Sequence, residues 1–173
     1  MTEAALPAPS TTLGLSRLAL ARLAALLLPV GLLSGALASQ YLGGLHPCEM
    51  CYWQRWPHGA AIVLAALAFT TSAESPRSRS LTALAALAIA ISGAIGVYHA
   101  GVELGIFEGF TTCTAMSSRA SNADLLRQIT HAPLVRCDQV QFQFLGISMA
   151  GWNAILSLSG AAVIAFLLSR GGK

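Results

Sequence analysis

Charged residues are scarce in this chain of 173 residues, at 10%, whereas hydrophobic residues make up 55%. An ordinary soluble domain carries about 25% charged residues, so the composition excludes that class. The net charge of +3 is too small to indicate a nucleic-acid partner. No repeat is present, and low complexity is confined to a Pro/Ser/Thr-rich N-terminus. The scarcity of charge therefore indicates a membrane protein.

Four apolar stretches are long enough, or nearly so, to supply the about 20 helical residues that cross a hydrocarbon core. They lie near residues 18–42, 52–71, 81–102 and 144–168. Little of the chain then remains for a separate soluble domain. The sequence predicts a single membrane domain over residues 1–173, which is an all-α bundle of four transmembrane helices.

Basic residues are distributed unequally between the two ends of this expected bundle. Six of the ten lie near the termini or in the short link between the second and third spans: Arg17, Arg22, Arg77, Arg79, Arg170 and Lys173. By the positive-inside rule, both termini and that link are expected to be cytoplasmic. The connections at 43–51 and 103–143 then lie on the outer side. We expect the first span to remain as an anchor, although Ala36-Leu37-Ala38 has the small residues of a signal cleavage site.

Glycines spaced four residues apart occur in two places, Gly31 with Gly35 and Gly101 with Gly105. In membrane helices this spacing lets two helices approach closely. We expect these glycines to serve helix packing alone.

Cysteine is absent from the expected cytoplasmic side and from mid-membrane, and all four cysteines fall in the outer connections. Cys48 and Cys51 form a Cys-x-x-Cys pair, and at helical spacing they are close enough for a disulfide. Arg55 lies four residues after Cys51 on the same face. Its charge and the positive end of a helix both favour the thiolate, which is the reactive form. The pattern predicts a redox pair at a membrane surface.

The main alternative is a non-enzymatic membrane scaffold with two static structural disulfides. A bridge between Cys48 and Cys51 closes so small a ring that it constrains the unfolded chain very little. A bridge between Cys113 and Cys137 would close a longer loop and stabilise the fold by roughly 3 kcal/mol on the entropic model. For that second pair alone, a structural role is a sound interpretation.

Metal and haem sites are further alternatives. Zinc sites usually offer two close ligand pairs, whereas 23 residues separate Cys113 from Cys137. Haem would use His58 and His99 as axial ligands, but the cysteines would then have no role. We therefore expect no metal.

The order of these residues resembles the DsbB family, the inner-membrane thiol:quinone oxidoreductases of bacteria. The resemblance rests on Cys48-x-x-Cys51 with Arg55 after it, on residues 98–103 (Tyr-His-Ala-Gly-Val-Glu) leading to Cys113, and on Cys137-Asp138 running into residues 144–153. It covers the chain from about residue 17 to 168. Vitamin K epoxide reductase-like proteins carry their loop cysteines before the Cys-x-x-Cys, so the order here favours DsbB.

The resemblance implies an electron path from a DsbA-like periplasmic thioredoxin-fold protein to a quinone, ubiquinone or menaquinone. Cys113 would form the mixed disulfide with the partner, and Cys137 would then attack Cys48. Cys51 would face the quinone, while Arg55 hydrogen-bonds a ring oxygen. A DsbA-like partner is itself a strong oxidant, at about −120 mV, so the path needs a more oxidising acceptor. His99 is expected to help bind the quinone, since an imidazole can donate a hydrogen bond.

Residues 121–131 read as a short helix between the last two cysteines. Ser121 and Asp124 resemble a capping box, and Pro133 follows the end. Such a helix would lie on the outer leaflet and let the loop move, or would simply pack against the bundle.

Overall fold

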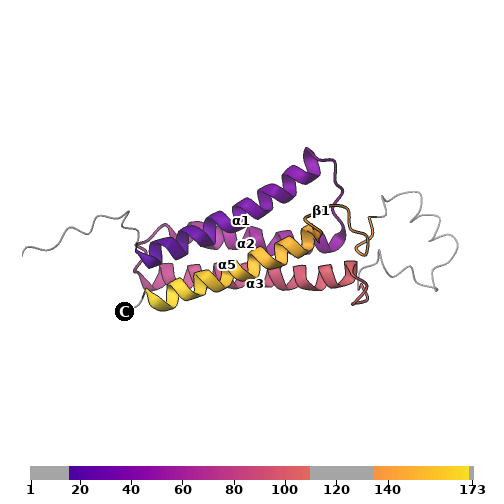
Figure 1. Ribbon diagram of the computed structural model, residues 1–173. Coiled ribbons are helices and arrows are strands. Elements are labelled where there is room, and N and C mark those ends of the chain that lie inside the picture. The colour runs from indigo at the N-terminus through magenta and orange to yellow at the C-terminus, as the bar shows by residue number, and fades with distance from the viewer. Residues whose placement is uncertain (1–15, 110–134, 172–173) are drawn as a thin grey trace, which may run out of the picture.

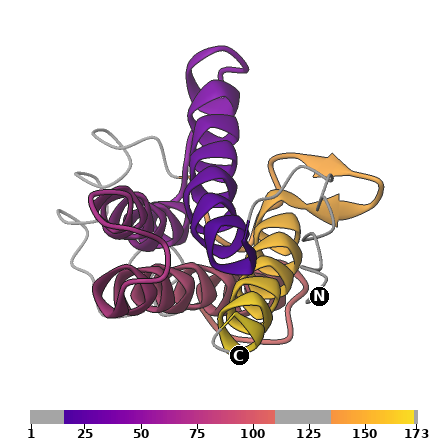
Figure 2. The same cartoon turned by 90° about the vertical axis from the view of Figure 1, so that its left-hand side faces the viewer.

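The computed structural model describes residues 16–109 and 135–171, which form four long helices and a short hairpin. The helices are α1 (Arg17–Tyr41), α2 (Glu49–Ala68), α3 (Pro76–Glu103) and α5 (Met149–Arg170), and the strands are β1 (Gln143–Phe144) and β2 (Ile147–Ser148). α1 packs chiefly against α2 and α5, and α3 packs against the same two helices. The helices thus form a four-cornered bundle, seen from its end in Figure 2. Figure 1 shows α1 leaning away from the bundle toward the end that carries the hairpin.

Serine side chains begin three of the four helices. Ser16, Ser75 and Ser148 each accept a hydrogen bond from the backbone N–H three residues further on, at 3.2, 3.1 and 3.1 Å. Each bond satisfies a donor that the first turn of a helix leaves without an internal partner. Pro76 follows Ser75, where its missing N–H has no cost. These caps fix the helix starts from local sequence.

The apolar core lies in the half of the bundle away from the hairpin and is built mainly of alanine. Its buried members are Ala21, Ala25, Ala61, Ala65, Ala85, Ala86, Ile89, Ala161 and Ile164. Arg22 lies at this end of the bundle and links α1 to the end of α2, because it donates hydrogen bonds to the carbonyls of Ala68 and Thr71 at 3.1 and 2.8 Å. These carbonyls lie at the end of α2, where a cation is favoured by the helix dipole.

The all-helical architecture is confirmed for the described residues, apart from the hairpin, and α1, α3 and α5 are long and apolar enough to cross a membrane. The predicted start of the last helix at residue 144 is wrong. Leu145 and Gly146 have φ of 53° and 78°, which makes a type I′ turn between β1 and β2, and the Ser148 cap delays the helix to Met149. The helix predicted at 121–131 lies outside the described residues.

The expectation that Gly31 with Gly35, and Gly101 with Gly105, pack helices together is wrong. Among the described residues, a Cβ on Gly31 or Gly35 would meet nothing within 4 Å, so none of the four helices packs closely against either glycine. A Cβ on Gly101 would overlap the ring of Phe107, in the chain that folds back after α3, and Gly105 adopts a φ of +71° in that turn. A spacing of four residues between glycines permits close helix packing. Here the neighbouring helices contact other faces of α1 and α3 than the ones that carry these glycines.

Candidate functional site

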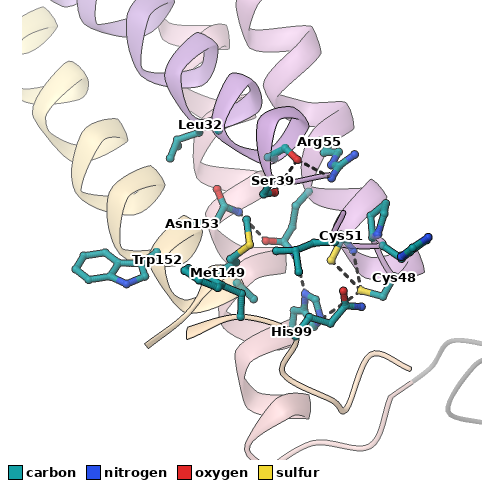
Figure 3. A pocket seen from close by; sticks show the side chains of 18 of the residues that line it. Leu32, Ser39, Cys48, Cys51, Arg55, His99, Met149, Trp152 and Asn153 are labelled. Carbon is teal, nitrogen blue, oxygen red and sulfur yellow. Dashed lines mark hydrogen bonds between the residues drawn. The ribbon is translucent and has the colours of Figure 1, made fainter. Parts of the chain in front are cut away.

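A cavity of about 610 Å³ lies among α1, α2 and α5 at the end where α1 leans away. Figure 3 shows side chains around it, including Leu32, Ser39, Cys51, Arg55, Met149, Trp152 and Asn153. Gly31 and Gly35 line the α1 side, where their missing side chains leave room. The volume is typical of a small-molecule site, and so is a mostly apolar wall with a few polar groups.

The Cys-x-x-Cys pair forms the first turn of α2. Cys48 is the N-cap residue, and its Sγ accepts the backbone N–H of Cys51 at 3.3 Å. The two Sγ atoms lie 2.9 Å apart and face each other in Figure 3. Cys48 is buried, whereas Cys51 is partly exposed and lines the cavity. The local helix start therefore brings both cysteines to the cavity wall, with Cys51 the more exposed of the two.

The two thiols differ in acidity, and both precede residue 52, where the expected second span begins. Hydrogen bonds with Cys137 and Cys51, together with burial, raise the pKa of the Cys48 thiol. The hydrogen bond from Cys48 lowers the pKa of Cys51, against the opposing effect of burial, and the charge of Arg55 lowers it further. Of the two thiols, Cys51 is therefore the one that ionises first, and it lines the cavity.

Arg55 joins α2 to α1 at the cavity wall. Its guanidinium donates to Gln40 Oε1 at 2.5 Å and to the carbonyl of Ala36 at 3.2 Å, and it lies 5.3 Å from the ring centroid of Tyr52. These contacts hold the group beside the cavity that Cys51 also lines. The cation thus lies between two helices. It is positioned to act on a group bound in the cavity.

His99, from α3, contacts the cysteine pair from below in Figure 3. Its Nε2 lies 3.5 Å from Cys48 Sγ, and the ring also hydrogen-bonds the backbone of Cys137. Cys137 is 1% exposed and packs in one buried cluster with Cys48, Met50 and Val102. The structure thus brings the second outer connection onto the first cysteine pair. Cys113 lies outside the described residues.

A chain of buried polar side chains runs from His58 to the cysteines and was not anticipated from the sequence. His58 Nε2 lies 2.9 Å from Asn153 Oδ1, and Asn153 Nδ2 donates to Gln54 Oε1 at 2.8 Å. Gln54 Nε2 lies 2.8 Å from His99 Nδ1, and His99 contacts Cys48. The available signal was a glutamine, a histidine and an asparagine within apolar helical segments, since polar groups in such segments are usually functional.

Backbone carbonyls fix the direction of this chain. Gln54 Nε2 also donates to the carbonyl of Met50, and Asn153 Nδ2 to that of Ser92, both at 3.2 Å. A carbonyl only accepts, so neither amide can be reversed without losing a bond. His99 Nδ1 is then an acceptor, and its Nε2 carries the hydrogen that faces Cys48. In the chain from His58 to Cys48, each donor therefore points its hydrogen toward the cysteines. This direction favours negative charge on Cys51.

A metal ion is disfavoured by the same arrangement. Cys48, Cys51 and His99 place their ligand atoms within 4.8 Å of one another, which is close enough to share an ion. Zinc would bind the lone pair of a ring nitrogen. The nitrogen nearest the sulfur, His99 Nε2, carries hydrogen instead. His58 and His99 each hydrogen-bond an amide group through one ring nitrogen.

Two carboxylates border the site, and each has a partner. Glu103 accepts from Ser148 at the start of α5, and its Oε1 lies 3.9 Å from His99 Nε2. Asp138 follows Cys137 and accepts two hydrogen bonds from Arg136, the closer at 2.5 Å. Arg136 lowers the pKa of the Asp138 carboxyl. The Arg136–Asp138 pair therefore adds no net charge next to Cys137.

The structure therefore gathers five of the six residues predicted for the site: Cys48, Cys51, Cys137, Arg55 and His99. All except Cys137 line the cavity. Sequence reasoning missed Gln54 and Asn153, and it weighed His58 only as a haem ligand.

Comparisons with known proteins identify the family and several relatives of this chain. A family model described as disulfide bond formation protein DsbB matches residues 17–167. A disulfide bond formation protein B from Aromatoleum aromaticum is 30% identical over 152 residues, covering 82% of this chain and 88% of that protein. One from Polaromonas is 27% identical, covering 82% and 84%. An uncharacterized protein of Rickettsia prowazekii is 25% identical over 73% of each chain. No solved structure matches with significance.

Proposed function

The chain belongs to the DsbB family of disulfide bond formation proteins, and from this we propose that it is a membrane thiol:quinone oxidoreductase. It would reoxidise a DsbA-like periplasmic dithiol protein and so sustain disulfide bond formation. One observation carries the proposal: the Cys48–Cys51 pair opens onto a cavity with Arg55 in its wall, and Cys137 packs against Cys48. A scaffold with static bridges needs neither feature.

Thiol–disulfide exchange accounts for the first part of the reaction. A thiolate of the reduced partner attacks Cys113 of a Cys113–Cys137 disulfide, and Cys137 leaves as a thiolate. Cys137 attacks Cys48, which releases Cys51 as a thiolate. The second partner thiol then completes the partner's disulfide and frees Cys113, and Cys113 attacks Cys137 to free Cys48. Two electrons have moved to Cys48 and Cys51, and the Cys113–Cys137 disulfide has formed again.

The contacts support each transfer that involves described residues. Cys137 and Cys48 share one buried cluster, so their exchange needs little movement. Cys51 is the better leaving group because its pKa is lowered, and Cys48 keeps its proton. The hydrogen-bond chain through His99 adds to this difference in acidity between Cys48 and Cys51. We therefore assign His99 a role toward the sulfurs as well as toward a ligand in the cavity.

A quinone fits the cavity by volume, by its mostly apolar wall and by the donors of Arg55. When bound, it supplies the acceptor for two electrons and two protons. Arg55 would donate a hydrogen bond to an oxygen there and stabilise negative charge on it, while α1 holds the guanidinium in place.

The membrane arrangement completes the proposal. α2 has the length of a span and packs between α1 and α3, although its first turns carry Glu49, Gln54 and Arg55. We propose α2 as the fourth span, both termini in the cytoplasm and the cysteines on the periplasmic side of a bacterial inner membrane. The basic residues near the termini and in the link after α2 support this orientation.

The test is quinone reduction by protein purified in detergent and supplied with a reduced DsbA-like protein. We expect absorbance changes of the quinone with wild type, none with Cys51→Ser, weaker turnover with Arg55→Ala, and wild-type turnover with the control Arg77→Ala at the opposite end. No turnover by folded wild type with intact disulfides would reject the oxidoreductase and favour the static scaffold.

A further inference from the structure

His58 has a ring nitrogen whose bonding capacity is unused. The residue lies in α2, lines the cavity and is 3% exposed. Nε2 is bound to Asn153, but buried Nδ1 has no hydrogen-bond partner among the described residues. A buried polar atom without a partner is rare in folded proteins and calls for an explanation. The cavity is the space from which a ligand can supply one.

The neighbours of Asn153 decide what kind of partner Nδ1 needs. The amide nitrogen of Asn153 donates to Gln54 Oε1 and to the Ser92 carbonyl, so its Oδ1 is the atom that faces His58. Ser157 Oγ donates to the same Oδ1 at 2.9 Å. Nε2 of His58 must therefore carry the ring hydrogen, and Nδ1 of the neutral ring carries a lone pair. His58 offers the cavity an acceptor.

Arg55 lies on the same face of α2 and offers hydrogen-bond donors, whereas His58 offers an acceptor. Cys51, Arg55 and His58 follow one another at i, i+4 and i+7, which spans about 10 Å along the helix. Arg55 has only donors, whereas neutral His58 has only an acceptor to give. A ligand lying along this face would meet the Arg55 donor near Cys51 and the His58 acceptor about one turn further along α2.

We propose that His58 Nδ1 accepts a hydrogen bond from a hydroxyl of the reduced ligand, and that the site therefore binds hydroquinone more tightly than quinone. The inference rests on the proposed function and adds a specificity-determining residue to it. A quinone carbonyl has no hydrogen to donate and would face the lone pair unfavourably, whereas a hydroquinone hydroxyl satisfies it. Preference for the reduced form raises the potential of the bound couple, by about 30 mV for each tenfold of preference, and so favours electron transfer away from the cysteines.

The test measures binding instead of turnover. A short-chain ubiquinone and its hydroquinone are titrated anaerobically into the full-length protein in detergent, and quenching of tryptophan fluorescence reports binding, because Trp152 lines the cavity. In wild type we expect hydroquinone to bind about tenfold more tightly than quinone, as one buried hydrogen bond allows.

Two substitutions separate this role from a structural one. His58→Gln keeps an amide donor toward Asn153 and a carbonyl acceptor, whereas His58→Phe removes both. We expect the Phe variant to lose the preference about tenfold and the Gln variant to retain part of it, while the affinity for quinone changes less than about twofold in both. Thr70→Val, at an exposed position outside the cavity wall, is the control and should keep the preference.

The outcomes distinguish failure of this inference from failure of the proposed function on which it rests. A preference that persists in His58→Phe would assign His58 to packing and overturn the inference while leaving the quinone site intact. Failure of wild type to bind either form would overturn the proposed quinone site itself, and this inference with it.

Discussion

The acidity of Cys51 should depend on the hydrogen bond from Cys48 more than on Arg55. Replacing Cys48 by alanine removes the donor that lies 2.9 Å from Cys51 Sγ, and with it the largest cause of the lowered pKa. A hydrogen bond to a charged group contributes about 1.5–3 kcal/mol, and 1.4 kcal/mol is a factor of ten. The acid dissociation constant of Cys51 should therefore fall by roughly 10- to 100-fold.

The assay is the rate of alkylation of Cys51 by iodoacetamide in fully reduced protein, followed over pH by mass spectrometry of the labelled peptide. Because the pKa of Cys51 is lowered, wild type should react at a pH where an ordinary thiol is still protonated, and the Cys48→Ala profile should move to higher pH. Cys48→Ser retains a hydroxyl donor and should keep most of the effect. Arg55→Gln should move the profile less than Cys48→Ala.

Two results would refute this reasoning. If Cys48→Ala reacts like wild type at every pH, the pair does not control the thiolate. If Arg55→Gln produces the larger change, the cation dominates, as the sequence pattern alone suggests, and the hydrogen-bond chain from His99 has no part in it.

Three further predictions follow from the cavity, the cysteine cluster and the polar chain. Gly35→Leu should occupy the cavity without a clash, since a Cβ there meets nothing within 4 Å, and should weaken quinone binding by about tenfold or more with the fold unchanged by circular dichroism. In a Cys51→Ala variant, Cys48 and Cys137 should form a disulfide that peptide mapping detects, because they share one buried cluster. Asn153→Leu should destabilise the protein by about 1–3 kcal/mol in denaturant unfolding, because Gln54 loses a buried partner.

Each of these has its own control. Gly35→Ala should show a smaller loss of binding than the leucine variant, and equal binding by all three proteins would place the ligand elsewhere. A Cys48–Cys137 bridge that appears only after unfolding would contradict the packing described here. For the polar chain, Ser159→Ala removes a hydroxyl that bonds only within its own helix among the described contacts, and it should leave stability unchanged. Equal stability of the Asn153 variant would contradict the network.

Local sequence determined much of this protein. The scarcity of charge and the length of the apolar stretches predicted the helices, because each depends on composition within one segment. Cys48, Cys51 and Arg55 could be placed together for the same reason, since i, i+3 and i+4 spacings are fixed by helix geometry. The last helix start was missed because residues 144–148 are apolar enough to extend a span, yet their backbone turns at Leu145 and Gly146.

Only the tertiary structure decided which groups from different helices meet. Gln54, His99 and Asn153 come from α2, α3 and α5, and nothing in their spacing along the chain predicts that their side chains form one directed set of hydrogen bonds. The same holds for Gly31 and Gly35, whose spacing predicted helix contact but whose faces border a cavity. Periodicity determines which residues share a face of one helix. The packing of four helices, with α1 inclined at one end, determines what each face contacts.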